Sequence, residues 1–313
     1  MKKRIGGQAV MEGVMMKNQD QYAVSVRKPD GKIETKIEEY VSVSEKYKIL
    51  GFPLLRGIVN FVESMVIGMK TLNYSAEFFD DDEIETTSKF DQWLERTFSG
   101  KGEKLLMGLI VVISLCISVG LFMILPYLVS SFFEKVISSH SIILLIEGIV
   151  RVGLFLGYIV LISRMEDIKR LFMYHGAEHK TINCLEAGEE LTPENVKKYS
   201  RLHKRCGTSF LFFVMIISII VYFFITVDTM WLRILSRILL IPVIAGISYE
   251  VIRFAGNSES KIIQVLSKPG LSLQYLTTKE PDEGMIEVAI ASVEGVLDWH
   301  AYIDEVKKEH ESA

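Results

Sequence analysis

Ser141–Ser163 reads SIILLIEGIVRVGLFLGYIVLIS. Its length and its apolar character are typical of a helix that crosses a bilayer, which needs roughly 20 such residues. Three further runs have the same character and extend over about Lys104–Leu128, Thr208–Val227 and Trp231–Phe254. The sequence therefore predicts a mainly α-helical integral membrane protein with a four-helix transmembrane bundle, two helices in 104–163 and two in 208–254.

The composition agrees with a membrane protein. Of the 313 residues, 49% are hydrophobic and 24% are charged, and the mean hydropathy is +0.28. The charged residues are segregated from the apolar runs. Because the formal net charge is only -4, no general attraction to polyanions is expected, and sequence-specific nucleic acid is not an expected partner. No apolar core follows the basic start Met1–Arg4, so we predict no cleaved signal peptide.

The distribution of basic residues predicts the orientation. The connection between the second and third runs, residues 164–207, contains most of the Lys and Arg residues that flank the membrane: Arg164, Lys169, Arg170, Lys180, Lys197, Lys198, Arg201, Lys204 and Arg205. By the positive-inside rule this segment is cytoplasmic. We therefore expect a multi-pass protein of the cell membrane with both termini in the cytoplasm, and we expect the basic segment to meet anionic lipid head groups.

The region before the first span predicts two parts. Residues 1–50 form a β-rich unit, in which Tyr22–Arg27 and Lys32–Ile37 flank the turn residues Pro29-Asp30-Gly31 as a hairpin. Gln8–Met16 is expected to add a third strand, which makes a small meander. Residues 51–103 contain an amphipathic helix over Leu54–Leu72 and an acidic linker that begins near Phe79. An interfacial helix and an ordinary globular helix are equally consistent with this pattern.

The region after the last span, residues 255–313, predicts a cytosolic helical tail. Gly256-Asn257-Ser258 is expected to break the helix, and Lys268-Pro269-Gly270 is expected to form a loop. Pro281–Val306 has apolar residues at helical spacing, with acidic residues after the proline, which predicts one amphipathic helix.

A metal site is indicated by Tyr174-His175-Gly176-Ala177-Glu178-His179-Lys180. Two imidazoles four residues apart share one face of a helix, and H-x-x-E-H is the inverted zinc-peptidase signature. His203 and Cys206, three residues apart, could share a second helical face. The ion would be zinc or another divalent transition metal.

Two arrangements of the ligands are open. In a closed structural site, His175, His179, His203 and Cys206 all bind the metal. In a catalytic site, His175 and His179 bind the metal and Glu178 is the general base. His203, Cys206 or Glu250 would complete the shell, and Glu250 is the carboxylate candidate.

A second group of charges lies inside the apolar runs. Glu147 and Arg151 are four residues apart, and Arg237 lies at a similar depth in the last run. Charges at such depth are costly unless they are paired. We expect either a Glu147–Arg237 pair or a Glu147–Arg151 pair.

The chain resembles the YqhQ-like family of uncharacterised bacterial polytopic membrane proteins. The resemblance rests on GGQAVMEGVMM at Gly6–Met16, Arg56-Gly57, YHGAEHKTIN at Tyr174–Asn183 and HKRCGTSF at His203–Phe210. It implies a polytopic bacterial membrane protein with cytosolic motif regions, and the family is sometimes labelled as predicted metal-dependent enzymes.

Two functions are expected from these features. The first is a membrane-bound, cytosol-facing, metal-dependent hydrolase of unknown substrate. The alternative is a non-enzymatic factor for membrane-protein biogenesis or assembly, whose partners would be other membrane proteins or the protein-conducting channel.

Overall fold

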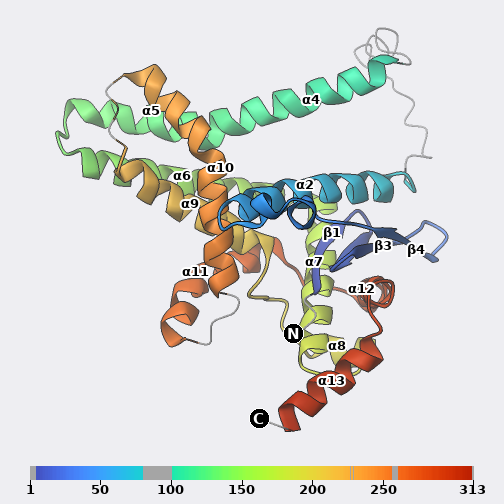
Figure 1. The fold of residues 1–313 in the computed structure, drawn as a ribbon. Helices are drawn as coiled ribbons and strands as arrows, with labels where there is room; N and C mark the ends of the chain where they lie inside the picture. The colour runs from blue at the N-terminus through green and yellow to red at the C-terminus, as the bar shows by residue number, and fades with distance from the viewer. Residues whose placement is uncertain (1–4, 80–100, 226, 228, 256–259, 312–313) are drawn as a thin grey trace. The chain divides into compact units, whose positions relative to one another are not determined.

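The computed structural model describes residues 5–79, 101–225, 227, 229–255 and 260–311 (Figure 1). The chain forms two compact units. Unit 1 consists of Met1–Phe79, Ile159–Ile217 and Leu240–Ala313, and unit 2 consists of Asp80–Tyr158 and Ser218–Leu239. The predicted acidic linker lies almost entirely in 80–100, outside the described residues.

Unit 1 contains an antiparallel four-stranded sheet with the order β1-β2-β3-β4. Its strands are β1 (Ile5–Val10), β2 (Gly13–Asn18), β3 (Gln21–Arg27) and β4 (Ile33–Glu39). The predicted N-terminal meander is confirmed. The prediction of one strand over Gln8–Met16 is wrong, because Met11 and Glu12 form a tight turn. Glu12 has φ 47°, and a Cβ on Gly13 would lie 2.3 Å from the Ser25 carbonyl oxygen, so glycine is required there.

Both faces of the sheet are covered. Tyr22, Val24 and Val26 point to one face and pack with Ile67 of α2 (Leu55–Ala76). Val14, Met16 and Ala23 point to the other face, in a larger core with α7 (Glu166–Glu186) and α12 (Glu283–Glu294). Successive strand residues alternate between faces, so β2 and β3 are apolar on both sides.

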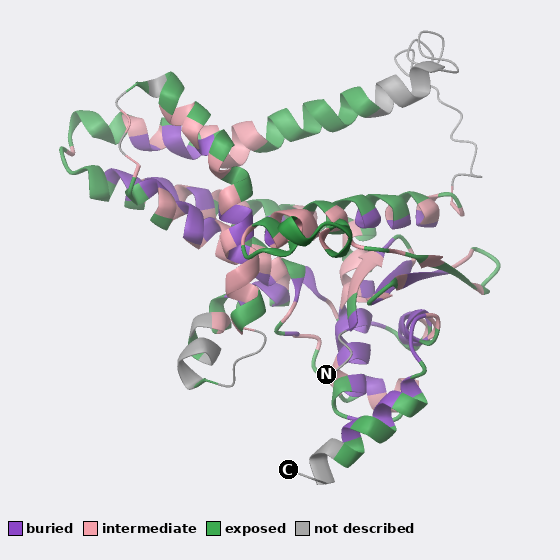
Figure 2. Cartoon of the chain, in the orientation of Figure 1, coloured by how far each residue is buried: buried purple, intermediate pink, exposed green. Residues whose placement is uncertain are grey.

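Buried residues predominate in α12 and in the second half of α7 (Figure 2). Unit 1 also contains shorter and peripheral helices. They are α1 (Val43–Lys46), the 3-10 turn η1 (Lys48–Gly51), α8 (Pro193–Lys197), α11 (Lys261–Thr277) and α13 (Trp299–Glu311). Two predictions are wrong here. Lys268-Pro269-Gly270 lies inside α11 instead of forming a loop. Pro281–Val306 is two helices rather than one.

The break between α12 and α13 lies where the chain packs closely against β3. Gly295 follows α12, and a Cβ on it would lie 2.6 Å from the Ala23 Cβ. Asp298 then accepts a hydrogen bond from the Ala301 backbone N–H at 3.1 Å, which starts the next helix. The predicted helix start was right, since Asp282 caps α12 by accepting from the Met285 N–H at 2.8 Å.

Unit 2 contains most of the apolar helices. They are α4 (Lys101–Val119), the π-helical turn η2 (Gly120–Ile124), α5 (Leu125–Ser131), the 3-10 turn η3 (Phe132–Lys135) and most of α6 (His140–Ile162). Pro126 in α5 has no N–H to donate to the preceding turn, which accounts for the local π-helical turn. α9 (Gly207–Phe223) and α10 (Met230–Ala255) are divided between the units.

Among the described residues, three helical segments are long and apolar enough to cross a membrane: Gly108–Lys135, His140–Ile162 and Trp231–Ala255. The fourth predicted span corresponds to α9, which is apolar but shorter, with 17 residues. A helix of that length extends roughly 25 Å, against a hydrocarbon core of about 30 Å. The mainly helical fold is confirmed, and three of the four predicted spans meet the length criterion.

Candidate metal centre

The histidine motif lies on α7, and its burial depends on two glycines. A Cβ on Gly176 would lie 2.0 Å from the Lys279 carbonyl oxygen, so glycine lets α7 approach the chain after α11. A Cβ on Gly7 of β1 would lie 2.7–2.8 Å from Glu178 side-chain atoms, so glycine lets the sheet cover Glu178. These contacts bury Glu178 and His179 at 4% and 1% exposure.

Three potential ligands converge. Among the described residues, ligand atoms of His175, His179 and Cys206 lie within 4.8 Å of one another. The Cys206 Sγ is 3.3 Å from His175 Nε2. That distance is close to the roughly 3.5 Å that separates nitrogen and sulfur ligands in a tetrahedral zinc site. The residues therefore fit three protein ligands of a zinc-class ion.

The backbone fixes the tautomer of both histidines. His175 Nδ1 lies 2.9 Å from the Thr277 carbonyl oxygen, and His179 Nδ1 lies 2.6 Å from the Arg201 carbonyl oxygen. Because a carbonyl only accepts, each Nδ1 carries the proton and each Nε2 keeps its lone pair. Histidines that bind metals are commonly oriented in this way.

The third ligand is held by hydrogen bonds around it. The Thr208 N–H donates to the Cys206 Sγ at 3.3 Å. Gln274 of α11, which is fully buried, donates to the His203 carbonyl at 2.8 Å and to the Ser209 Oγ at 2.9 Å. It also accepts from the His203 N–H at 2.8 Å. Gln274 thereby fixes the segment that carries Cys206.

Glu178 lies beside the three ligands. Its Oε2 is 4.0 Å from His175 Nε2 and has no hydrogen-bond partner. Burial raises the pKa of Glu178 to about 7, and an electrostatic interaction with His175 opposes this rise. Burial also lowers the pKa of His179, which favours the neutral imidazole that binds metals.

His203 does not belong to this group. It lies in an irregular segment before α9, so it shares no helical face with Cys206. Its Nε2 is 3.5 Å from Glu186 Oε2, which directs the ring toward that carboxylate. The four-ligand arrangement with His203 therefore does not match the cluster.

Glu250 is also outside the group. Both of its oxygens accept from Arg56 of α2, at 2.6 and 2.5 Å. Glu250 is thus a partner of Arg56. The ligand atom that lies close to the two imidazoles is the Cys206 Sγ. Cys184, the other thiol near the motif, is buried in the core, and burial raises its pKa to about 12.

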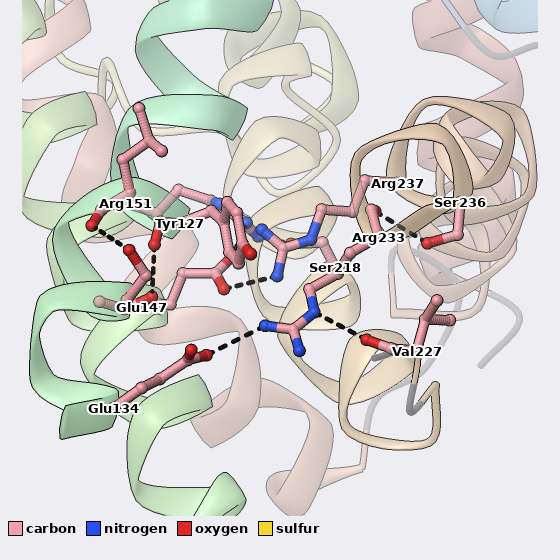
Figure 3. A network of polar contacts seen from close by, with 12 residues as sticks. Tyr127, Glu134, Glu147, Arg151, Ser218, Val227, Arg233, Ser236 and Arg237 are labelled. Carbon is pink, nitrogen blue, oxygen red and sulfur yellow. Dashed lines mark hydrogen bonds and ion pairs between the residues drawn. The ribbon is translucent and has the colours of Figure 1, made fainter. Parts of the chain in front are cut away.

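The charges inside the apolar helices form one group in unit 2 (Figure 3). Glu147 accepts from Arg151 at 2.6 Å through Oε1 and from Arg237 at 2.6 Å through Oε2. Arg151 also donates to the Ser218 Oγ at 2.7 Å. The structure thus contains both of the pairs that the sequence offered as alternatives.

Comparison with known proteins identifies the family. The family described as "Protein of unknown function (DUF1385)" matches residues 52–299. The chain belongs to this family. It is similar to the "Uncharacterized protein YqhQ" of Bacillus subtilis (strain 168), with 37% identity over 309 residues, which cover 97% of this chain and 95% of the relative. The YqhQ-like resemblance is confirmed.

The comparisons supply no activity for the family. Neither the family description nor the name of the relative mentions a metal, a substrate or a reaction. No solved structure matches the chain.

Sequence reasoning missed several groups that build the site. Close approach of the backbone is possible at Gly7 and Gly176, and Gln274 forms hydrogen bonds that hold the segment before α9. The backbone carbonyls of Thr277 and Arg201 accept hydrogen bonds from the two imidazoles. Gly7 and Gly176 stand in motifs that the sequence singled out. The two carbonyls leave no trace in the sequence, because every residue has one.

Proposed function

We propose that this protein is a metal-dependent hydrolase bound to the cell membrane, with its site on the cytosolic side. The observation that carries the proposal is the convergence of His175, His179 and Cys206 beside a buried carboxylate with an unpartnered oxygen. Three protein ligands with an open position are characteristic of catalytic zinc sites, whereas structural sites use four. Zinc or a similar divalent ion would be held by His175 Nε2, His179 Nε2 and Cys206 Sγ.

The metal would act as a Lewis acid on a water molecule or a substrate oxygen. In this proposal, Glu178 accepts the proton from an attacking water through Oε2 and returns it to a leaving group. Thr277 and Arg201 keep both imidazoles in the tautomer that binds metals. β1 covers Glu178 and excludes bulk water from its carboxylate.

Metal quantification of the purified protein tests the ligand set. About one equivalent of a transition metal is expected for the wild type, with loss in the His175→Ala/His179→Ala and Cys206→Ser variants. His203→Ala is the matched control, since it removes a buried histidine outside the group, and it should keep the metal. A metal-free wild type, or full retention in the double histidine variant, refutes the site.

The Glu178→Gln variant tests catalysis separately from binding. It should keep the metal and fold, yet fail to replace the wild type in a strain that lacks this protein. A variant that keeps the metal and restores growth fully would instead favour the non-enzymatic role in membrane-protein assembly. Co-purification of membrane-protein partners after crosslinking in cells would then be the next measurement.

A further inference from the structure

The buried charged group in unit 2 contains more positive than negative charges. Glu147, Arg151 and Arg237 are 3%, 6% and 4% exposed. One carboxylate therefore faces two guanidinium groups inside apolar helices. The other described ion pair of this unit, Arg233 with Glu134 at 3.0 Å, is neutral and partly exposed. Among the described residues of unit 2, one buried positive charge has no counter-charge.

Some hydrogen-bonding capacity of the arginines is also unused. Arg237 Nη1 and Arg151 Nε are buried and have no hydrogen-bond partner. The guanidinium carbon of Arg237 is 4.8 Å from the ring centre of Tyr127 and 5.1 Å from that of Tyr222. Figure 3 shows Arg237 beside the Tyr127 ring. The ring faces attract the cation, but they leave the N–H group without an acceptor.

A small cavity adjoins Arg237. It has a volume of about 20 Å³, and its lining includes Tyr127, Ser130, Tyr222, Arg233 and Arg237. Two carboxylates also line it. Both oxygens of Glu147 already accept from the arginines, and Glu134 forms an ion pair with Arg233. A cavity of this size holds one water-sized group.

We propose that this cavity is an anion site, in which Arg237 donates to a single negatively charged atom. A halide ion fits as a whole. A phosphate fits only by inserting one anionic oxygen while the rest of the group stays outside. The shared chemistry is one anionic acceptor the size of a water molecule, which supplies both the absent counter-charge and the absent hydrogen-bond acceptor.

The bound anion would have a structural role between the packed helices. A buried positive charge is costly in an apolar medium, so an anion at Arg237 stabilises unit 2. This role is independent of the metal centre in unit 1, and neither result would decide the other.

The test uses the full-length protein purified in a neutral detergent. The melting temperature is followed while sodium gluconate is replaced by sodium chloride at constant ionic strength, which keeps general screening fixed. Parallel arms add inorganic phosphate or phosphatidylglycerol. A saturable rise with chloride or phosphate supports a free anion, and a rise with phosphatidylglycerol alone supports a lipid phosphate as the source.

Two variants assign the response to Arg237. Arg237→Gln should raise the half-saturating chloride concentration by at least about tenfold, the effect of losing a charge-assisted hydrogen bond. Arg253→Gln, an exposed position further along α10, is the matched control and should respond like the wild type. If Arg237→Gln does not fold, Ser130→Val decides, because it fills the cavity and leaves the ion pairs intact.

Three results overturn the proposal. The first is a melting temperature that does not change in any of the three arms. The second is an Arg237→Gln variant with the wild-type response. The third is an unchanged response in Ser130→Val.

Discussion

At the scale of single residues, the geometry of the site depends on two glycines, which have no Cβ atom. Gly7 and Gly176 let β1 and the chain after α11 come within contact of α7. Each would need a neighbour to move if it carried a Cβ. These glycines therefore shape the candidate metal centre through close packing.

Gly7→Ala should weaken the site. The added Cβ would lie 2.7–2.8 Å from Glu178, so either Glu178 or β1 must shift, at a cost of about 1–3 kcal/mol. A lower melting temperature and reduced metal content are expected. Gly6→Ala is the matched control, because a Cβ there has no atom within 4 Å. Equal behaviour of the two variants would contradict the close packing of Glu178.

Glu250→Gln should lower the stability of the protein without changing its metal content. Its carboxylate forms a bidentate ion pair with Arg56, and both side chains are 26% exposed. Weakening the pair should lower the free energy of unfolding by about 1 kcal/mol and leave the metal in place. Metal analysis and thermal unfolding check this outcome. Loss of the metal in Glu250→Gln, as in Cys206→Ser, would restore Glu250 as a candidate ligand.

At the scale of elements, α2 is oriented differently from a helix whose polar stripe faces water. Its polar residues bind other elements: Asn60 donates to the Tyr249 hydroxyl at 2.8 Å, and Glu63 accepts from the Ser42 hydroxyl at 2.9 Å. Its exposed residues include the apolar Val62, Met65, Val66 and Met69, beside the polar Ser64, Lys70 and Asn73. An uncovered apolar stripe marks a contact surface.

We predict that this stripe contacts lipid. α2 packs on the part of α10 around Gly246 and Glu250, so it lies beside a candidate membrane helix, as an interfacial helix would. A nitroxide at Val66, which is 62% exposed, should be more accessible to oxygen than to a water-soluble nickel complex in reconstituted protein. A nitroxide at the exposed Glu305 of α13 is the control. The same accessibility at both positions would rule out lipid contact.

At the scale of the whole molecule, the number of crossings sets the location of the termini. Three described segments are long enough to span, and α9 is shorter. The basic segment 164–207 predicts four crossings and two cytoplasmic termini, which requires α9 to cross as well.

Reporter fusions check this topology. Green fluorescent protein at either terminus should fluoresce in a bacterial host, and alkaline phosphatase after Ala313 should be inactive. Phosphatase fused after Lys135 should be active, since that connection is predicted to lie outside. An active C-terminal phosphatase would mean that α9 does not cross and that the chain spans three times.

Much of the fold could be read from local patterns. The apolar runs located the long helices, turn residues located the β3–β4 hairpin, and the four-residue spacing placed His175 and His179 on one face. The failures share one cause. The turn at Glu12, the break after Gly295 and the helix through Pro269 depend on what packs against them, and a linear pattern does not contain that information.

The sequence by itself determined a mainly helical chain with apolar helices of membrane-spanning length, and two imidazoles and a carboxylate on one helix, because hydrophobicity and helical spacing act locally. The tertiary structure alone decided the rest of the site. It brought Cys206, rather than His203 or Glu250, next to the two imidazoles, since the ring of His203 faces Glu186 and the carboxylate of Glu250 binds Arg56. The tertiary structure also pairs Arg170 with Glu12, and Lys180 with backbone carbonyls and Glu280. These basic groups are therefore paired within the fold rather than with lipid, because a buried charge without a partner is costly.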